Sequence, residues 1–322
     1  MKTKDKVFEI LLDNIGNSVS GEEIAKKLGV SRNSVWSAVT SLKRDGYKIS
    51  SVTNIGYTFS NDNDIFTDKS IQKYLEREHK IIIFDEVNST NSVAKEMAYH
   101  EKEGTVVIAK RQLCGRGRMG RTFSSNSENG LYMSIILKPH DATQSTNITI
   151  LCATAVYEAI LEVCGKESRI KWVNDIFLNN KKICGILTEG AINIENGMLD
   201  YAICGIGVNL SLPNGGFDES LKYIAGSIYE KEIPCGYKAK LCAAIINKFF
   251  KYYYRISEKE YMKIYREKSN IIGEEVSVSF GKEIIEGKAI DIDEDAKLVV
   301  KTKDGEILRF SSGEARVRKN GK

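Results

Sequence analysis

The chain has 322 residues, and 42% of them are hydrophobic, so it is long enough for two or three folded domains and too apolar for a disordered protein. Its net charge of +4 is too small by itself to indicate a nucleic-acid-binding protein. No run of about eighteen apolar residues stands out and the N-terminus lacks an apolar signal core, so neither a membrane span nor a signal peptide is expected.

The first sixty residues have the pattern of a winged helix-turn-helix. Apolar residues at helical spacing predict a first helix over 7–15. Ser20, three residues before Glu23, predicts the capped start of a second helix, which Gly29 ends. Ser31 can cap a third helix, and YKISSVTNIGYTFS predicts the two short strands of a wing. Helix, tight turn and helix in this order indicate DNA binding.

The third helix is expected to read DNA from a domain at residues 1–62. Short polar side chains at its start could contact base edges in the major groove, and its basic end could meet phosphate. The candidate DNA-binding residues are Ser31, Arg32, Asn33, Ser34, Ser37, Lys43 and Arg44. A purely structural helical hairpin is the alternative. Both tryptophans, Trp36 and Trp172, are expected in the core. The polar stretch NDNDIFTD (61–68) is predicted to be a linker.

Residues 63–270 mix strand and helix patterns. Strands are predicted at 81–87, 105–112, 130–137, 169–175, 183–190 and 198–210. Helices are predicted at about 90–99, 148–163, 218–230 and 236–268. Short hairpin signals at 179–182 and 195–197 favour a mixed, mainly antiparallel sheet with helices on one side over a doubly wound parallel sheet.

The last segment, 271–322, has short strands separated by turns such as GK, DEDA and KDGE, a pattern typical of a small β-barrel. The prediction is therefore an α+β protein of three domains. Seven cysteines are scattered singly without a C-x-x-C pair, which favours a reducing compartment, and we expect a cytoplasmic protein. The three histidines stand far apart, so no zinc site is predicted.

Residues 115–121 read GRGRMGR and match the spacing G-x-G-x-x-G. A dinucleotide fold needs a helix directly after these glycines, but the following TFSSNSENG has no helical period. Kinase and P-loop motifs are also missing from the sequence. A solvated basic surface loop is the plain alternative. We interpret the stretch as a flexible lid, because glycines let a loop fold over a ligand and arginines pair with phosphate or carboxylate oxygens.

Other stretches of the central block have unusual composition. Ser89, Thr90 and Asn91 stand between a strand and a helix, where small polar groups could bind a neutral polar ligand. KWVND (171–175) places Lys171 inside a predicted strand, on one face with Val173 and Asp175. CGIL and GIGVN carry glycine inside strands, which often marks close approach of a ligand or backbone.

In order along the chain, GRGRMGR after a strand ending in RQ, then KWVND, GILTE and GIGVNL, resemble the biotin protein ligases. With the N-terminal helix-turn-helix, the chain resembles the bifunctional class that is both biotin–[acetyl-CoA-carboxylase] ligase and biotin-operon repressor. The resemblance covers essentially the whole chain. It implies a class II synthetase-like catalytic domain and an SH3-like C-terminal barrel.

The resemblance also implies a two-step reaction and its site. Biotin and ATP, with Mg²⁺, would form biotinyl-5′-AMP, and a lysine of biotin carboxyl carrier protein would then take the biotin. Carried over by position, the biotin-binding residues are Ser89, Thr90, Asn91, Gln112, Arg116, Gly117, Arg118 and Lys171. The nucleotide-binding residues are Arg121, Phe123, Asn174, Asp175 and Asn209, and the catalytic residues are Lys171 and Arg118. No protein ligands for Mg²⁺ are assigned.

This sequence departs from the family pattern at Val173, where proline is usual, at the variable loop position Met119, and at Phe123, where a familiar member has tryptophan beside adenine. Gly313, Glu314 and Arg318 match the family's C-terminal motif.

The implied partners are the carrier protein, other biotin-accepting domains, operator DNA and, when biotinyl-AMP is bound, a second copy of the chain; no membrane partner is expected. Two alternatives stay open. One is a ligand-sensing transcription factor without ligase activity, and the other is a lipoate ligase.

Overall fold

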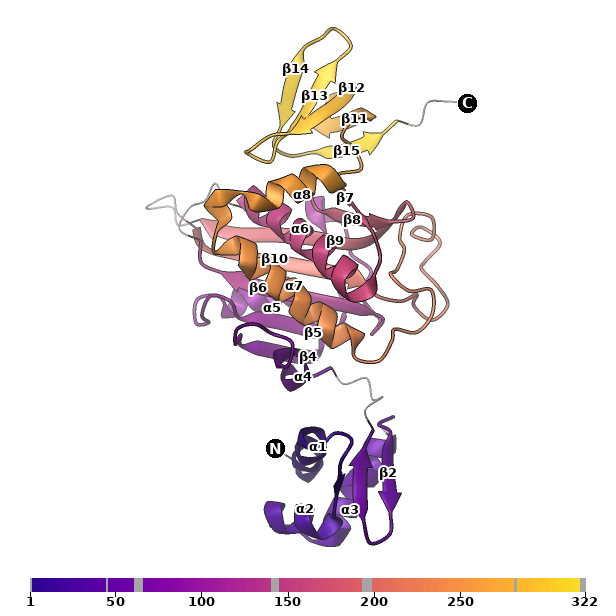
Figure 1. Ribbon diagram of the computed structural model, residues 1–322. Helices are drawn as coiled ribbons and strands as arrows, with labels where there is room; N and C mark the ends of the chain where they lie inside the picture. Colours follow the sequence, from indigo (N-terminus) through magenta and orange to yellow (C-terminus); the bar gives the residue numbers. More distant parts are fainter. Residues whose placement is uncertain are drawn as a thin grey trace. The chain divides into compact units, whose positions relative to one another are not determined.

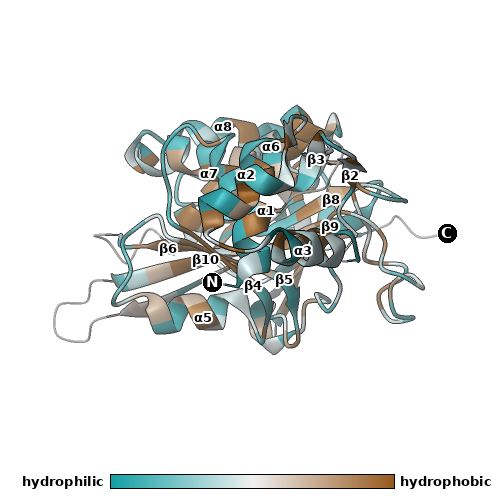
Figure 2. Cartoon of the chain, turned by 90° about the horizontal axis from the view of Figure 1, so that it is seen from below, coloured by the Kyte–Doolittle hydropathy of each residue, from teal (hydrophilic) through white to brown (hydrophobic). Residues whose placement is uncertain are grey.

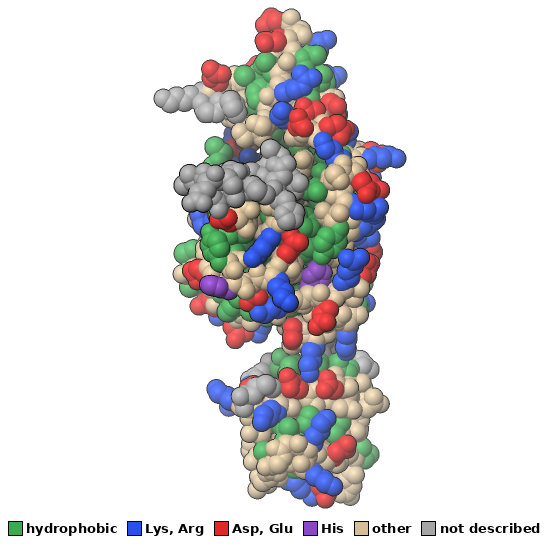
Figure 3. Space-filling model, turned by 90° about the vertical axis from the view of Figure 1, so that its left-hand side faces the viewer, with side chains coloured by type: hydrophobic (Ala, Val, Ile, Leu, Met, Phe, Trp, Pro, Cys, Tyr) green, Lys and Arg blue, Asp and Glu red, His purple; other side chains and the backbone are tan. Residues whose placement is uncertain are grey.

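The computed structural model describes residues 2–44, 46–60, 66–139, 145–192, 199–280 and 283–318 (Figure 1). The chain divides into two compact units, Met1–Ile65 and Phe66–Lys322. The domain boundaries predicted at 62 and 270 stay predictions. On the face that Figure 3 shows, Lys and Arg side chains are interspersed with Asp and Glu side chains, so the small positive net charge does not gather there into one basic patch.

The first unit is the predicted winged helix-turn-helix. Its elements are α1 (Thr3–Asp13), β1 (Ser18–Val19), α2 (Gly21–Leu28), α3 (Arg32–Arg44), β2 (Ile49–Val52) and β3 (Gly56–Phe59). The three strands pair antiparallel in the order β1-β3-β2. The caps predicted from the sequence are present: the Ser20 side chain accepts from Glu23 N at 3.0 Å, and Gly29 ends α2 with φ +65°. Apolar residues from all three helices and β3 form one core.

The second unit is built on a seven-stranded mixed sheet. Its strands are β4 (Ile81–Val87), β5 (Val106–Gln112), β6 (Gly130–Leu137), β7 (Arg169–Lys171), β8 (Asp175–Leu178), β9 (Lys181–Ile192) and β10 (Leu199–Asn209). They lie in the order β4-β5-β6-β10-β9-β8-β7. Among these strands β4 and β5 pair parallel and the others antiparallel, which confirms the predicted mixed sheet.

Helices cover both faces of this sheet (Figure 2). One face packs against α6 (Ser145–Cys164), α7 (Tyr237–Tyr253) and α8 (Glu260–Lys268), and the other against α5 (Thr90–Met97). Along β5, Val106 and Ile108 belong to the large core, whereas Val107 packs with Ala94 of α5, because alternate side chains of a strand point to opposite faces. The prediction of helices on one side is therefore wrong for α5.

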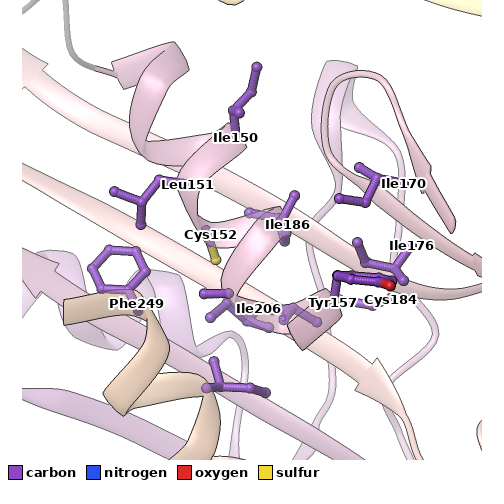
Figure 4. Close-up of a cluster of buried hydrophobic side chains, with 14 of the residues drawn as sticks. Ile150, Leu151, Cys152, Tyr157, Ile170, Ile176, Cys184, Ile186, Ile206 and Phe249 are labelled. Atoms are coloured by element: carbon purple, nitrogen blue, oxygen red, sulfur yellow. The ribbon is translucent and has the colours of Figure 1, made fainter. Parts of the chain in front are cut away.

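The large core lies between the sheet and α6 (Figure 4). Leu151 and Cys152 of α6 face Ile186 and Ile206 of the sheet, with Phe249 of α7 beside them. By length and composition, Thr146–Cys164 could cross a membrane, although 67% of that window is buried inside the protein. The sequence did not predict a membrane span at these residues because threonines and glutamates interrupt the apolar run. Its burial identifies it as the central core helix.

Four sequence predictions need correction. The strand predicted at 169–175 is a hairpin, β7 and β8, joined through residues 172–174. Residues 218–230 form turns and bridges rather than a helix. The helix predicted at 236–268 divides into α7, a 3-10 turn at Ile256–Glu258, and α8. The short helix α4 (Asp68–Gln72), capped by Thr67, begins at the last residue of the predicted linker. Residues 61–65 of that linker and the hairpin signal at 195–197 lie outside the described residues.

The C-terminal part is a five-stranded antiparallel sheet. Its strands are β11 (Glu275–Phe280), β12 (Glu283–Ile292), β13 (Leu298–Thr302), β14 (Ile307–Phe310) and β15 (Glu314–Val317), in the order β14-β13-β12-β11-β15. Within the described residues β14 and β15 remain edge strands, so the sheet is curled rather than closed. It belongs to the second unit, and Trp172 Nε1 donates to Ala296 O at 3.0 Å.

Candidate active site

A cleft opens where the start of α5, the loop after β5, the β7–β8 hairpin and strands β9 and β10 come together. It encloses about 990 Å³ of space, including its open mouth, which is at the upper end of the range for small-molecule sites. Twelve of the thirteen residues predicted to bind biotin or nucleotide line it: Ser89, Thr90, Asn91, Gln112, Arg116, Gly117, Arg118, Arg121, Phe123, Lys171, Asn174 and Asp175.

Asn209 is the residue that does not line the cleft. It is buried at the end of β10, and its Nδ2 donates to Gly226 O at 2.9 Å. In this position it ties the 218–230 segment to the sheet, so a contact with nucleotide has no support from the geometry.

One end of the cleft, here called the polar end, is lined by Ser89, Thr90, Asn91 and Gln112, with Ser134 hydrogen-bonded to Thr90 and Asn91. All five side chains are buried. Thr90 donates to Gln112 Oε1 from its backbone N at 2.8 Å and from Oγ1 at 3.1 Å. The Ser134 hydroxyl lies 2.8 Å from Thr90 Oγ1 and 2.6 Å from Asn91 Oδ1. These neutral groups hold each other in place before any ligand arrives.

Glu189 of β9 anchors the polar end. Asn91 Nδ2 donates to its carboxylate at 2.7 Å, Lys95 Nζ lies at 2.5 Å, and Arg116 Nη1 at 3.7 Å. Burial would raise the pKa of Glu189, but the hydrogen bonds from Lys95 and Asn91 lower it, so the carboxylate stays charged.

Glu189 lies in the GILTE motif, but neither it nor Ser134 is among the site residues predicted from the sequence. A glutamate inside an otherwise apolar strand is the signal that could have found the first. No sequence feature near Ser134 marks it as a residue of the site.

The arginine-glycine loop is a hairpin closed by backbone hydrogen bonds. Gly117 N donates to Arg121 O at 2.7 Å, and Phe123 N donates to Gly115 O at 2.8 Å. Its tip is the 3-10 turn Arg118–Gly120, in which Met119 has φ +56° and Gly120 φ +72°. No α-helix follows, so the exclusion of a dinucleotide fold is confirmed. The loop predicted to be a flexible lid is therefore a hairpin, and its flexibility stays a prediction.

The other end of the cleft, here called the charged end, consists of Arg118, Arg121, Lys171, Asp175, Lys182 and Glu314. Lys182 Nζ lies 2.7 Å from Asp175 Oδ1, and Arg121 Nη2 lies 2.6 Å from Glu314 Oε2. Hydrogen bonding by Arg121 is the main reason that the pKa of Glu314 falls below its usual value. The two cations thus have carboxylate partners in the free protein.

Lys171 is partly buried at the end of β7, and its Nζ lies 5.5 Å from the centre of the Phe177 ring. Burial lowers its pKa, while the nearby carboxylates of Asp175 and Glu314 oppose that shift. Sequence reasoning placed Lys171 and Asp175 on one face of a single strand. They are instead opposite each other in the hairpin, which brings them together more directly.

Two strand glycines give space to cleft side chains. A Cβ on Gly205 would lie 2.1 Å from Asn91 Oδ1, and a Cβ on Gly207 would lie 2.6 Å from the Phe123 ring. Phe123 also meets Tyr132 edge to face, with ring centres 6.5 Å apart. The sequence predicted close approach of a ligand or backbone at these glycines, whereas the nearest atoms at Gly205 and Gly207 belong to protein side chains.

The residues predicted to bind DNA lie on α3, in the first unit. Arg32, Asn33, Ser37, Lys43 and Arg44 are exposed there. Ser31 caps α3 by accepting from Ser34 N at 3.1 Å, which engages its hydroxyl. Trp172 is buried as expected, but Trp36 is 61% exposed on α3, so its assignment to the core is wrong.

The chain is similar to known proteins over most of its length. Residues 3–58 match an HTH domain, residues 83–209 the Biotin/lipoate A/B protein ligase family, and residues 271–318 the Biotin protein ligase C terminal domain. The bifunctional ligase/repressor BirA of Bacillus subtilis is 33% identical over 309 residues, covering 92% of this chain and 93% of that protein. BirA of Escherichia coli is 24% identical, covering 94% of each. Biotin protein ligase from Aquifex aeolicus, solved in complex with biotin and ATP, superposes with a TM-score of 0.62 at 27% identity, covering 75% of this chain and 99% of that chain.

Proposed function

Because the chain belongs to the family of bifunctional biotin protein ligases and carries that family's helix-turn-helix repressor domain, we propose that its cleft joins biotin to AMP and passes the biotin to a carrier protein. The observation that carries this assignment is one cleft with a neutral, pre-formed polar end and a cationic charged end. Biotinyl-AMP needs both, since its ureido head is neutral and its phosphate is anionic.

In the first step a biotin carboxylate oxygen bonds to the α-phosphorus of ATP, and the bond to pyrophosphate breaks. This brings two anions together, so fixed cations lower the barrier by about 3–4 kcal/mol for each well-placed donor. Lys171 and Arg118 are the residues we assign to this role. In the second step a lysine amine of the carrier attacks the biotinyl carbonyl, AMP leaves, and a proton is lost from the amine. The attacking groups come from the substrates, so no nucleophilic protein side chain is required.

The polar end is proposed to bind the biotin head, with Ser89, Thr90 and Gln112 in contact with it and with Arg116 and Gly117 alongside. Gln112 Oε1 already accepts two hydrogen bonds from Thr90, which leaves its amide nitrogen for a ligand carbonyl. Asn91 is fully engaged with Ser134, Glu189 and the Leu187 carbonyl, so we assign it to shaping the end rather than to direct contact.

The charged end is proposed to bind the nucleotide. Arg121 would meet phosphate at the edge of the loop, and Phe123, packed on Gly207, offers a ring face for adenine. Arg118 Nη1 donates to Asn174 Oδ1 at 3.2 Å, which holds this arginine over the cleft, and Asp175 is held by Lys182. Mg²⁺ is proposed to enter with the ATP phosphates, as it usually does, keeping several of its waters.

The proposed partners are the biotin carboxyl carrier protein of acetyl-CoA carboxylase, other biotin-accepting domains and operator DNA. We propose a homodimer on a two-fold operator when biotinyl-AMP is bound, because one helix-turn-helix binds weakly. A cytoplasmic location, without a membrane partner, fits the seven free cysteines.

Incubating the purified protein with ATP, Mg²⁺, biotin and a carrier fragment tests the ligase. We expect the mass of the fragment to rise by one biotinyl group. No mass gain on the fragment would favour the ligand-sensing factor, and preferential transfer of lipoate in competition with biotin would favour a lipoate ligase.

A gel-shift with promoter DNA from the biotin biosynthetic genes of the source organism tests the repressor. Binding is expected to tighten when biotin and ATP are added together. If DNA binding does not depend on biotin and ATP, the regulatory proposal is wrong, and the ligase proposal is unaffected.

A further inference from the structure

The exposed tryptophan of the first unit has no role in the fold or in the proposed reaction. Trp36 is 61% exposed, whereas the other tryptophan of the chain, Trp172, is 3% exposed. Single exposed apolar residues are common on protein surfaces. Tryptophan is nevertheless enriched at interfaces because its large ring is apolar and its N–H is polar, so an exposed tryptophan with cations beside it is a candidate contact residue. Within the described residues 2–44 and 46–60, the other exposed large apolar side chains are Val52 and Ile55, both in the wing hairpin.

Helical geometry places Trp36 on a defined flank of α3. Val35, Ala38, Val39 and Leu42 face the core, so the opposite side of the helix faces outward. Arg32, Trp36 and Lys43, at positions i, i+4 and i+11, form one stripe along the edge of that outward face. Lys43 Nζ donates to Ser51 Oγ of β2 at 2.8 Å, which identifies this stripe as the flank toward the wing.

The other outward flank of α3 is different. Ser34, Ser37 and Ser41 border a shallow groove that Thr3 of α1 also lines. The short hydroxyl groups predicted to read DNA therefore lie partly against α1, while Trp36 extends from the wing side. Of the outward-facing side chains of α3, Trp36 offers the largest apolar surface.

The charged residues around Trp36 indicate which kind of partner it contacts. Arg32 precedes it by one turn, Lys43 and Arg44 follow two turns later, and all three are exposed. α3 itself contains no acidic residue. A second copy of the same face would bring these cations together, whereas DNA offers phosphates to the cations and a partly apolar base edge to the indole.

We propose that Trp36 contacts operator DNA in the major groove and reads the 5-methyl group of a thymine on the wing side of α3. Thymine is the base whose major-groove edge carries an apolar group, and a side chain that contacts it discriminates without hydrogen bonds. This inference rests on the proposed repressor function and adds a specificity-determining residue to it.

The test begins by selecting binding sites from a pool of randomised 40-base-pair duplexes with full-length protein, biotin, ATP and Mg²⁺. Each thymine of the enriched site is then replaced by uracil, which removes only the methyl group. For the unchanged protein we expect one uracil position in each half-site to weaken binding about tenfold, within the range for one lost base contact. For Trp36→Ala we expect weaker binding to the all-thymine site, by about tenfold, and no further loss from uracil at that position.

Trp36→Phe is the conservative variant and should retain most of the thymine preference, because a phenyl ring also packs on a methyl group. Binding to non-specific duplex and biotin transfer to a carrier fragment should be equal in all three proteins, which shows that both units fold. Equal uracil sensitivity in the unchanged protein and Trp36→Ala would overturn the inference. If the unchanged protein enriches no sequence at all, the repressor proposal itself fails, a result distinct from the previous one.

Discussion

The two ends of the cleft achieve order in different ways. At the polar end, buried neutral groups are hydrogen-bonded to one another around Glu189. At the charged end, cations are partly exposed and are paired with carboxylates of the protein, Lys182 with Asp175 and Arg121 with Glu314. A neutral head group can enter the first without rearrangement. An anionic phosphate must compete with the carboxylates of the second.

From this difference we expect the polar end to govern the affinity for biotin and the charged end to govern the rate of the chemical step. A network that is complete before binding fixes the position of a ligand and should govern its KM. Cations held beside the point where negative charge gathers stabilise the transition state, so Lys171 and Arg118 at the charged end should govern the chemical step. Three comparisons test that division and a fourth tests the stability of the charged end, with the largest effect expected first.

Replacement of Lys171 by alanine should slow biotinyl-AMP formation by about 100-fold or more, because it removes a partly buried cation from the point where negative charge gathers. Single-turnover kinetics with labelled ATP measure the rate. Lys181→Ala is a matched control, since Lys181 lies at the start of β9, is exposed and donates to Lys222 O. Unchanged adenylate formation by Lys171→Ala would refute its role.

Replacement of Glu189 by glutamine should raise the KM for biotin about tenfold and change kcat less, because the charge that orients Asn91 and Arg116 is lost. Glu189→Asp keeps the charge and should recover part of the affinity. Glu162→Gln, which removes an exposed ion pair with Lys248, is the control. A fall in kcat with unchanged KM would show that Glu189 acts at the chemical step instead.

The strand glycines offer a paired comparison. In Gly205→Ala the new methyl group displaces Asn91, so we expect a severalfold rise in the KM for biotin with little effect on ATP. In Gly207→Ala it displaces Phe123, so the KM for ATP should rise instead. Steady-state kinetics with each substrate varied in turn measure both. If both variants raised the KM for biotin and for ATP equally, the proposed division of the cleft into two ends would be wrong.

The smallest effect concerns acid stability. Arg121 lowers the pKa of Glu314, so this pair stabilises the fold above the ordinary carboxyl pKa, and the contribution is lost as pH falls through the lowered value. Arg121→Met should therefore reduce the free energy of unfolding at pH 7 by less than about 1 kcal/mol, because the pair is partly exposed, and by nothing measurable at pH 2. Urea unfolding at the two pH values gives the comparison. An equal deficit at both would mean that Arg121 stabilises by packing.

Local patterns predicted the elements whose formation depends on local contacts. Strands β4 and β6 have the predicted bounds, and the caps at Ser20 and Ser31 are present, because a strand alternation or a cap is set by residues within a few positions. The errors fall where distant contacts decide. Residues 218–230 have helical composition but are tied by backbone bonds to Lys182 and by Asn209 to the sheet.

The sequence by itself determined the winged helix-turn-helix, the mixed sheet and the residues of the cleft, since periodicity and motif order are written along the chain. The tertiary structure decided which of those residues meet. It turned 171–175 into a hairpin that sets Lys171 opposite Asp175, completed the polar end with Ser134 and Glu189, removed Asn209 from the cleft and exposed Trp36. Burial and pairing depend on residues far apart in sequence, and no local pattern contains them.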